Sequence, residues 1–124
     1  MTIGTNTFLL DAYNANPSSM HAALESFAEM PVEKKIVILG DMLELGEVSL
    51  QEHKDILRYL KDQDFDKVIL AGEEFKKALD HSSFDFLHFK NADELKTWFQ
   101  QQEFSDTYFL LKGSRLIGLE RLLA

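Results

Sequence analysis

The sequence predicts an α/β fold: a three-layer sandwich in which helices cover both faces of a mostly parallel sheet of about five to six strands. Five apolar runs recur along the 124 residues, and amphipathic stretches with helical spacing separate them. Four of the runs are nearly continuous in Val, Ile, Leu and Phe, which is typical of strands buried on both faces. We therefore expect a Rossmann-like arrangement with right-handed crossovers, in a single domain over residues 1–124.

The expected strands are the apolar runs at residues 7–12, 35–40, 67–72, 84–89 and 107–112. The fourth run, FDFLHF, differs from the others because it alternates. Phe84, Phe86 and His88 fall on one face of such a strand, and the intervening residues fall on the other. This pattern predicts a strand at the edge of the sheet.

Helices are expected from Pro17, from Ser49, over residues 73–79, from Asn91 and over residues 114–123. Pro17 can occupy the first turn of a helix, where its missing N–H is not needed. Ser49 with Glu52, and Asn91 with Glu94, have the spacing of a capping box.

Composition excludes several classes of function. Lys and Arg number 13 against 21 Asp and Glu, giving a formal charge of −8, and there is no Cys. Nucleic acids and anionic membranes attract basic surfaces, so neither is expected as a partner. No disulfide framework is possible, and no apolar run approaches the roughly 20 residues that span a bilayer. We expect a cytoplasmic monomer.

Polar residues are concentrated after the first expected strand, in the segment DAYNANP. They could be turn formers and a helix cap, but a cap needs only one of them. A carboxylate at Asp11 suits the hydroxyl pair of a ribose, and Tyr13, Asn14 and Asn16 suit the edge or face of a base. The segment therefore indicates nucleotide binding, beside the simpler structural interpretation.

The segment GDMLELGE follows the second expected strand. Gly40 and Gly46 fit tight turns, and the apolar residues between them could anchor the loop. A carboxylate directly after a buried strand is costly without a partner, so we expect Asp41 to contact a ligand or a basic residue. His53, one turn into the second helix, is expected to brace this loop.

The segment KGSR lies between the fifth expected strand and the last helix. Backbone N–H groups at a helix start, with Lys112 before Gly113 and Arg115 after Ser114, would form an anion site. The alternative is that both cations are solvated on the surface. The chain contains neither the GxxxxGK[ST] nor the GxGxxG phosphate-binding pattern, so we do not expect it to hold a nucleotide's phosphates alone.

Three segments carry a family resemblance: DAYNANPSSMHAAL, ILGDMLELGEVSLQEH and LLKGSRLIGLERLL. In order and spacing they resemble the C-terminal domain of the Mur ligases, which build peptidoglycan precursors in the bacterial cytoplasm. Within that family, YNANP, GDMLELG and KGSR are similar to the member that adds D-alanyl-D-alanine. The sister ligases carry a His-containing variant of the first motif, where this chain has Ala15 and Asn16.

The resemblance implies the third domain of a three-domain ligase. The N-terminal UDP-sugar domain and the central ATPase domain, with its phosphate loop and Mg²⁺ ligands, would lie outside this chain, which we expect to start at a domain boundary. ATP would phosphorylate the terminal carboxylate of UDP-N-acetylmuramoyl-tripeptide, and the amine of D-alanyl-D-alanine would attack the acyl phosphate. This domain would hold no catalytic residue, metal or tightly bound cofactor, and would be inactive alone.

The resemblance also implies roles for individual residues. Asp11 would bind the ATP ribose, and Tyr13, Asn14 and Asn16 would line the adenine side. Asp41 and the turn through Gly46 would form part of the closed site. Lys112, Ser114 and Arg115 would face phosphate or the dipeptide carboxylate. Which of Lys112 and Arg115 takes the carboxylate stays open. The alternative function is a free-standing Rossmann-like nucleotide-binding module.

Overall fold

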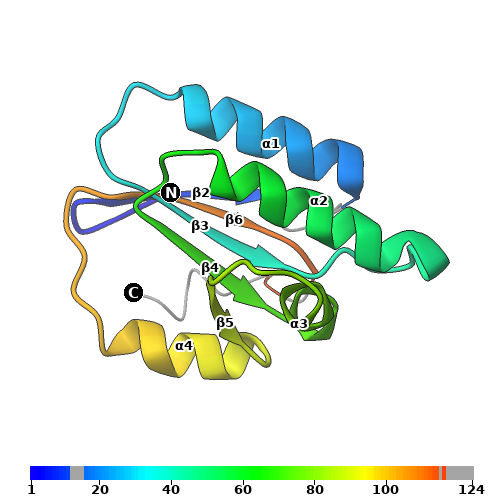
Figure 1. The fold of residues 1–124 in the computed structure, drawn as a ribbon. Helices are drawn as coiled ribbons and strands as arrows, with labels where there is room; N and C mark the ends of the chain where they lie inside the picture. The colour runs from blue at the N-terminus through cyan, green and yellow to red at the C-terminus, as the bar shows by residue number, and fades with distance from the viewer. Residues whose placement is uncertain (12–15, 115, 117–124) are drawn as a thin grey trace.

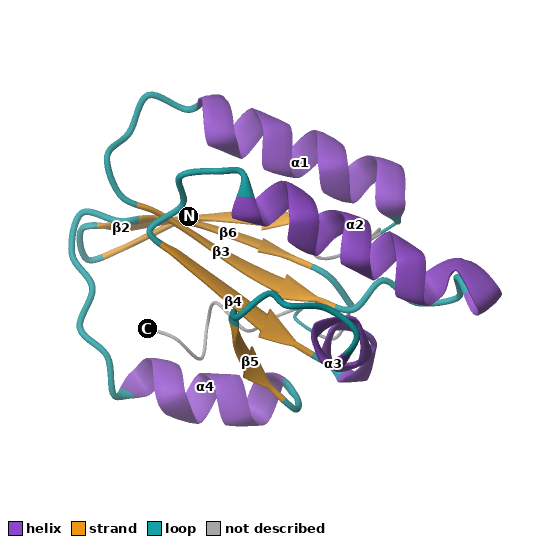
Figure 2. Ribbon diagram, in the orientation of Figure 1, coloured by secondary structure: helices purple, strands orange, loops and turns teal. Residues whose placement is uncertain are grey.

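The computed structural model describes residues 1–11, 16–114 and 116. Six strands form one sheet, and helices cover both of its faces (Figures 1 and 2). The elements in chain order are β1 (Thr2–Ile3), β2 (Asn6–Asp11), α1 (Pro17–Glu29), β3 (Lys35–Gly40), the 3₁₀ helix η1 (Gly46–Val48), α2 (Ser49–Lys61), β4 (Lys67–Ala71), α3 (Glu73–Asp80), β5 (Leu87–Phe89), α4 (Ala92–Gln100) and β6 (Tyr108–Lys112). The predicted three-layer α/β fold is confirmed.

The strand order in the sheet is β1-β2-β6-β3-β4-β5. Only β1 pairs antiparallel; the pairs β2–β6, β6–β3, β3–β4 and β4–β5 are all parallel. The five parallel strands therefore end at one edge of the sheet, and the segments that follow them meet there.

The direction in which the chain crosses the sheet explains the layers. From β2 through β3 and β4 to β5 the chain steps across the sheet, and α1, α2 and α3 pack into one core. It then returns from β5 to β6, and α4 lies on the opposite face (Figure 1). Crossovers of a single hand require this change of face when the direction reverses.

Alternating residues of the central strands enter two separate cores. Val37, Leu39 and Leu70 pack with the helices α1 to α3. Ile36 and Ile69 point the other way and pack with α4. Both sets are buried, which is why successive positions of these strands, facing opposite sides of the sheet, are both apolar. Each fully buried side chain of this kind contributes about 2 kcal/mol of transfer free energy.

One strand was not predicted, one predicted strand is shorter in the structure, and one predicted helix is largely not described. The strand β1 has only two residues, too few to show a pattern in the sequence. The run 84–89 does form the edge strand that was expected, but only over Leu87–Phe89. Phe84 and Phe86 instead stack on each other and pack against the first core. The expected helix over 114–123 lies largely outside the described residues.

Of the two predicted capping boxes, the one at α4 is half formed and the one at α2 is absent. The side chain of Asn91 accepts from the N–H of Glu94, but the Glu94 carboxylate accepts from Lys90 N–H and not from Asn91. The helix α2 has Val48 at its N-cap, with no side-chain hydrogen bond there. The hydroxyl of Ser49 is directed to another helix, as described below. Among the described residues, no helix combines the length and apolar character needed to cross a membrane.

Candidate functional site

A cleft of about 550 Å³ lies at the edge where the parallel strands end. Its walls are the segments after β3, β4, β5 and β6: residues 41–46 with Ser49, 71–74, 90–92, and Ser114 with Leu116. Open parallel sheets bind ligands outside the carboxyl ends of their strands, and this cleft has that position. It therefore joins two of the polar segments singled out in the sequence, GDMLELGE and KGSR.

These two segments are in direct backbone contact. The N–H of Ser114 donates to the carbonyl oxygen of Asp41 over 3.0 Å. Gly113 has φ +133°, and a Cβ atom there would overlap the backbone of Gly40. A Cβ atom on Gly40 would lie 2.7 Å from the carbonyl oxygen of Ser114. Both positions thus require glycine because the two loops cross without room for a side chain.

The carboxylate of Asp41 binds the start of α3. Its Oδ2 accepts from the N–H of Glu74 over 3.0 Å, and its Oδ1 accepts from the N–H of Phe75 over 3.1 Å. Gly72, the N-cap residue, has no side chain to cap the helix, and its φ of +116° brings it against the Asp41 carboxylate. We expected a ligand or a basic residue as the partner of Asp41; these two oxygens are instead bound to a helix N-terminus, where negative charge is stabilised.

His53 is fully buried and holds the backbone of the same loop. Its Nε2 accepts from the N–H of Met42 over 3.0 Å, and its Nδ1 lies 2.7 Å from the carbonyl oxygen of Ser49. The ring also contacts the ring of Phe75 edge-on, with centroids 4.7 Å apart. His53 therefore connects the start of α2 to the loop after β3 and to α3.

Ser49 and Glu74 complete these connections. The Ser49 hydroxyl donates to Oε1 of Glu74 over 2.6 Å, and Lys77 Nζ lies 3.2 Å from Oε2. The hydrogen bond from Ser49, and then that from Lys77, lower the pKa of the Glu74 carboxyl below its usual value. No sequence pattern predicted this pair, whose members are 25 positions apart.

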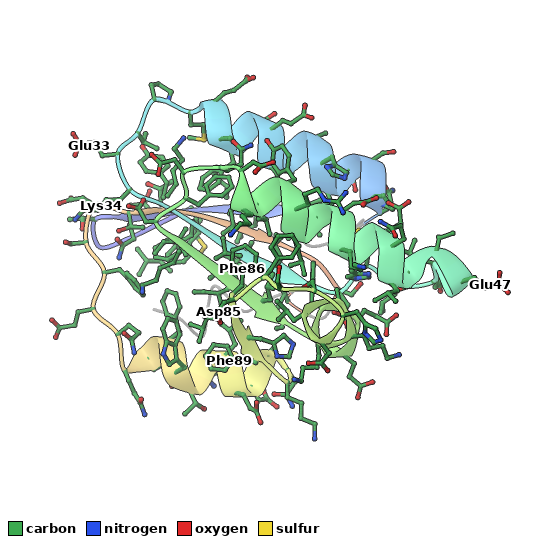
Figure 3. All side chains as sticks on the ribbon, in the orientation of Figure 1. Glu33, Lys34, Glu47, Asp85, Phe86 and Phe89 are labelled. Carbon is green, nitrogen blue, oxygen red and sulfur yellow. The ribbon has the colours of Figure 1, made fainter. Side chains whose placement is uncertain are left out.

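The remaining residues of the loop divide into anchors and exposed positions. Met42 is fully buried and Leu45 packs against the first core, whereas Leu43 is exposed. Glu44 and Gly46 both have positive φ, 64° and 58°. Figure 3 shows that the side chain of Glu47, beyond this turn, projects away from the body of the molecule. The loop is thus anchored at Met42 and Leu45 and reaches outward at its far end.

In the first polar segment, the structure describes two of the predicted site residues, Asp11 and Asn16. Asp11 ends β2, where its backbone pairs with that of Lys112 in β6. Asn16 is the N-cap of α1: its Oδ1 accepts from Ser19 N–H, and its own N–H donates to the Ser19 hydroxyl. Its side-chain oxygen thus has the structural role that the sequence left open. Tyr13 and Asn14 lie outside the described residues.

In the last polar segment, Lys112 is completely buried, so it is not a solvated surface cation. It shares the sheet face of Leu110, two residues earlier, which belongs to the core formed with α1 to α3. Ser114 is half-buried and lines the cleft, while Arg115 lies outside the described residues.

Lys90 and Asn91 also line the cleft, although sequence reasoning did not place them in a site. They follow β5, and Asn91 was identified only as a helix cap. Four acidic residues face the same space: Asp41, Glu44, Glu73 and Glu74. Within residues 1–11, 16–114 and 116, no group of three or more His, Cys, Asp or Glu could hold a metal ion.

The fold and this arrangement of loops define a class of protein. The family model described as "Mur ligase, glutamate ligase domain" matches residues 2–115. The chain belongs to the Mur ligase family.

Individual relatives narrow the similarity. The chain is 35% identical over 124 residues to UDP-N-acetylmuramoyl-tripeptide–D-alanyl-D-alanine ligase of Rickettsia prowazekii, covering 98% of this chain and 28% of the relative. Its structure is similar to a crystal structure of MurF from Acinetobacter baumannii, with TM-score 0.77 and 32% identity over 99% of this chain and 28% of the other. It is also similar to the structure of MurF ligase from Thermotoga maritima in complex with ADP. The TM-score is 0.69 and the identity is 26%, covering 94% of this chain and 27% of the other chain. The chain spans 28% of the length of that Rickettsia relative.

Proposed function

We propose that this chain is the C-terminal domain of an ATP-dependent ligase that adds D-alanyl-D-alanine to UDP-N-acetylmuramoyl-tripeptide. The observation that supports this most is that a ligase of this name is 35% identical across 98% of the chain. The ends of β3 and β6 lie side by side at one edge, so the second and third sequence motifs form one surface. We propose UDP-N-acetylmuramoyl and central ATPase domains in the rest of the protein, and no catalytic activity in this domain alone.

The proposed chemistry explains what such a domain contributes. ATP converts the terminal carboxylate of the tripeptide to an acyl phosphate, and the amine of the dipeptide attacks it and expels phosphate. The acyl phosphate must be protected from water, so a domain that closes over the substrates accelerates the productive reaction. His53 does not act as a general base in this scheme, because both ring nitrogens are engaged by backbone groups inside the fold.

The nucleotide is assigned to the end of β2. Asp11 would bind the ribose hydroxyls of ATP, and Tyr13, Asn14 and Asn16 would line the adenine. Because Oδ1 of Asn16 caps α1, this residue would contribute its amide nitrogen, a donor to the base. The phosphates and Mg²⁺ would be held by the central domain, where the ion stabilises charge on the transferred phosphoryl group.

The acceptor is assigned to the end of β6 and the adjoining cleft. Lys112, Ser114 and Arg115 would face phosphate or the dipeptide carboxylate. Since Lys112 is buried among the strand ends, we assign the carboxylate to Arg115 and the Ser114 region, with Lys112 contributing positive charge from beneath. Asp41 would act through the loop it fixes. A nucleotide-sugar substrate implies a cytoplasmic reaction in a bacterium, and we propose a monomer without nucleic-acid or membrane partners.

Substitution of Asp11 tests the nucleotide assignment. In the full-length ligase, Asp11→Ala should raise the KM for ATP about tenfold, because a carboxylate bound to two ribose hydroxyls contributes about 1.5 kcal/mol or more. The matched control is Asp64→Ala, which removes an exposed carboxylate in the turn before β4. An unchanged KM for ATP in the Asp11 variant would refute the ribose assignment.

Binding by the isolated chain distinguishes the proposed domain from a free-standing nucleotide-binding module. Calorimetry with ATP should give a Kd weaker than about 1 mM, since the chain lacks a phosphate-binding loop. Micromolar binding would favour the free-standing module.

A further inference from the structure

A closed circuit of hydrogen bonds joins three segments that line the cleft. His53 accepts from the N–H of Met42 and contacts the carbonyl of Ser49; Ser49 donates to Glu74; and the N–H of Glu74 donates to the carboxylate of Asp41, the neighbour of Met42. The circuit therefore passes through the loop after β3, the start of α2 and the start of α3. None of its links is local to a single helix except the contact between His53 and Ser49.

The circuit determines the tautomer of His53. Because Nε2 accepts a hydrogen bond from the Met42 backbone, it must present its lone pair, and the neutral ring must carry its hydrogen on Nδ1. That hydrogen is donated to the carbonyl oxygen of Ser49, 2.7 Å away. A ring with hydrogen on both nitrogens cannot accept from Met42. This conformation of the loop after β3 therefore requires a neutral His53 ring.

We infer that His53 is a positioning residue of the proposed ligase and an acid-sensitive latch: its Nδ1–H tautomer holds the loop 41–46 in the form that lines the cleft, and protonation of the ring releases it. The part concerning catalysis rests on the proposed function; the part concerning the loop does not. We expect the latch to affect the proposed binding site for the acceptor dipeptide. The carbonyl oxygen of Asp41 in this loop accepts a hydrogen bond from the N–H of Ser114, which lies in that proposed site.

The charges around the ring come from each element packed against it. From α3, Glu74 approaches through the Ser49 hydroxyl, with Lys77 on its other oxygen. From the loop after β3, Asp41 adjoins Met42, but its carboxylate oxygens are taken by the N–H groups of α3. On α2 itself the neighbours in sequence are Glu52 and Lys54. The donor that directly faces Nε2 is the Met42 N–H, and a protonated Nε2 would oppose it hydrogen to hydrogen.

Two variants separate the hydrogen bond from the volume of the ring. His53→Gln offers a side-chain oxygen that can accept from Met42 N–H, and its amide carries no titratable group. His53→Leu fills much of the same space and leaves a buried backbone N–H without an acceptor. A purely packing role would make the leucine variant the better replacement.

Nuclear magnetic resonance of the 124-residue chain tests the latch without reference to activity. Long-range ¹H–¹⁵N spectra should show His53 as the Nδ1–H tautomer at about pH 8, with slow exchange of the Met42 amide. Acidification that protonates the ring should reduce the protection of that amide at least tenfold in the wild type but not in His53→Gln. An Nε2–H tautomer, or equal protection of Met42 in the Gln and Leu variants, would overturn the inference.

Kinetics of the full-length ligase test the positioning role. His53→Leu should raise the KM for D-alanyl-D-alanine about tenfold and leave that for the UDP-tripeptide unchanged, while His53→Gln stays within about twofold of wild type. Equal effects of Leu and Gln, or a uniform loss in kcat alone, would overturn the positioning role. If the resonance results hold but the ligase does not use D-alanyl-D-alanine, the latch stands and the proposed function fails.

Discussion

Two helices that start at the same edge of the sheet begin in opposite ways. The helix α1 is capped by Asn16, whose partner Ser19 is three residues away. The helix α3 has glycine at its N-cap and is capped instead by Asp41, from the loop after β3, 33 and 34 residues away. One helix start is therefore complete within its own segment, whereas the other depends on a distant strand being in place.

The two helix starts therefore differ in how they depend on the candidate site: the start of α1 is stabilised by its own segment, and the start of α3 by a loop that lines the cleft. A cap made by neighbours keeps its geometry whatever the rest of the sheet does. A cap made by Asp41 couples the start of α3 to the loop that lines the cleft. A change in the conformation of that loop therefore alters the hydrogen bonds at the start of the helix. The comparison can be tested by altering each start in turn.

The largest effect is expected at the remote cap, from Gly72→Ala. The new Cβ would overlap the carboxylate of Asp41 and would stand on a backbone with φ +116°. We expect a loss of about 3 kcal/mol in the free energy of unfolding. Gly4→Ala is the matched control, because its φ is +61° but nothing lies within 4 Å; it should cost about 1 kcal/mol. Urea denaturation of both variants measures the difference, and equal losses would mean that the approach to Asp41 does not matter.

An intermediate effect is expected when the caps themselves are removed. Asp41→Ala deletes a charged group that accepts two backbone hydrogen bonds, and should cost about 2 kcal/mol. Asn16→Ala deletes a neutral, exposed cap and should cost about 1 kcal/mol. Thermal unfolding of the two variants ranks them. If the Asn16 variant proved the less stable, the remote cap would contribute less than the local one.

The smallest effect concerns the pH dependence of the remote start. The hydrogen bond from Ser49 lowers the pKa of Glu74 in the folded protein below the ordinary value of 4.5. The stabilisation is therefore complete above pH 4.5 and is lost as the pH falls through the lower folded-state pKa. Wild type should lose more stability than Glu74→Gln over this acid range, and Ser49→Ala should reduce the loss in the same direction. Parallel curves for wild type and Glu74→Gln would contradict this expectation.

Much of the fold could be predicted because its signals are local or periodic. Continuous apolar runs identified the parallel strands, since both faces of β3, β4 and β6 are buried. Pro17 and the spacing of apolar residues identified α1. The errors occurred where tertiary contacts overrode a local pattern. Ser49 has the spacing of a capping residue, yet its hydroxyl binds Glu74 on another helix.

The candidate site was predictable in place but not in detail. The segments GDMLELGE and KGSR meet where the parallel strands end, which is the edge at which sheets of this kind bind ligands. The partners of Asp41 could not be predicted, because they are backbone N–H groups more than 30 residues away and carry no residue-type signal. The burial of Lys112 was also unexpected. It follows from the central position of β6 in the sheet, and the sequence alone does not reveal the strand order.

The position of β6 between β2 and β3 has a consequence for how the domain is made. Thr7 in β2 and Ile36 in β3 pair with Tyr108 and Phe109, which the ribosome adds some 70 to 100 residues later. Until then β2 and β3 each have an open edge, and neither can bind the other in this fold. A nascent chain stopped before β6 therefore holds two strands that lack the strand between them, and the sheet becomes continuous only after residues 108–112 have been synthesised.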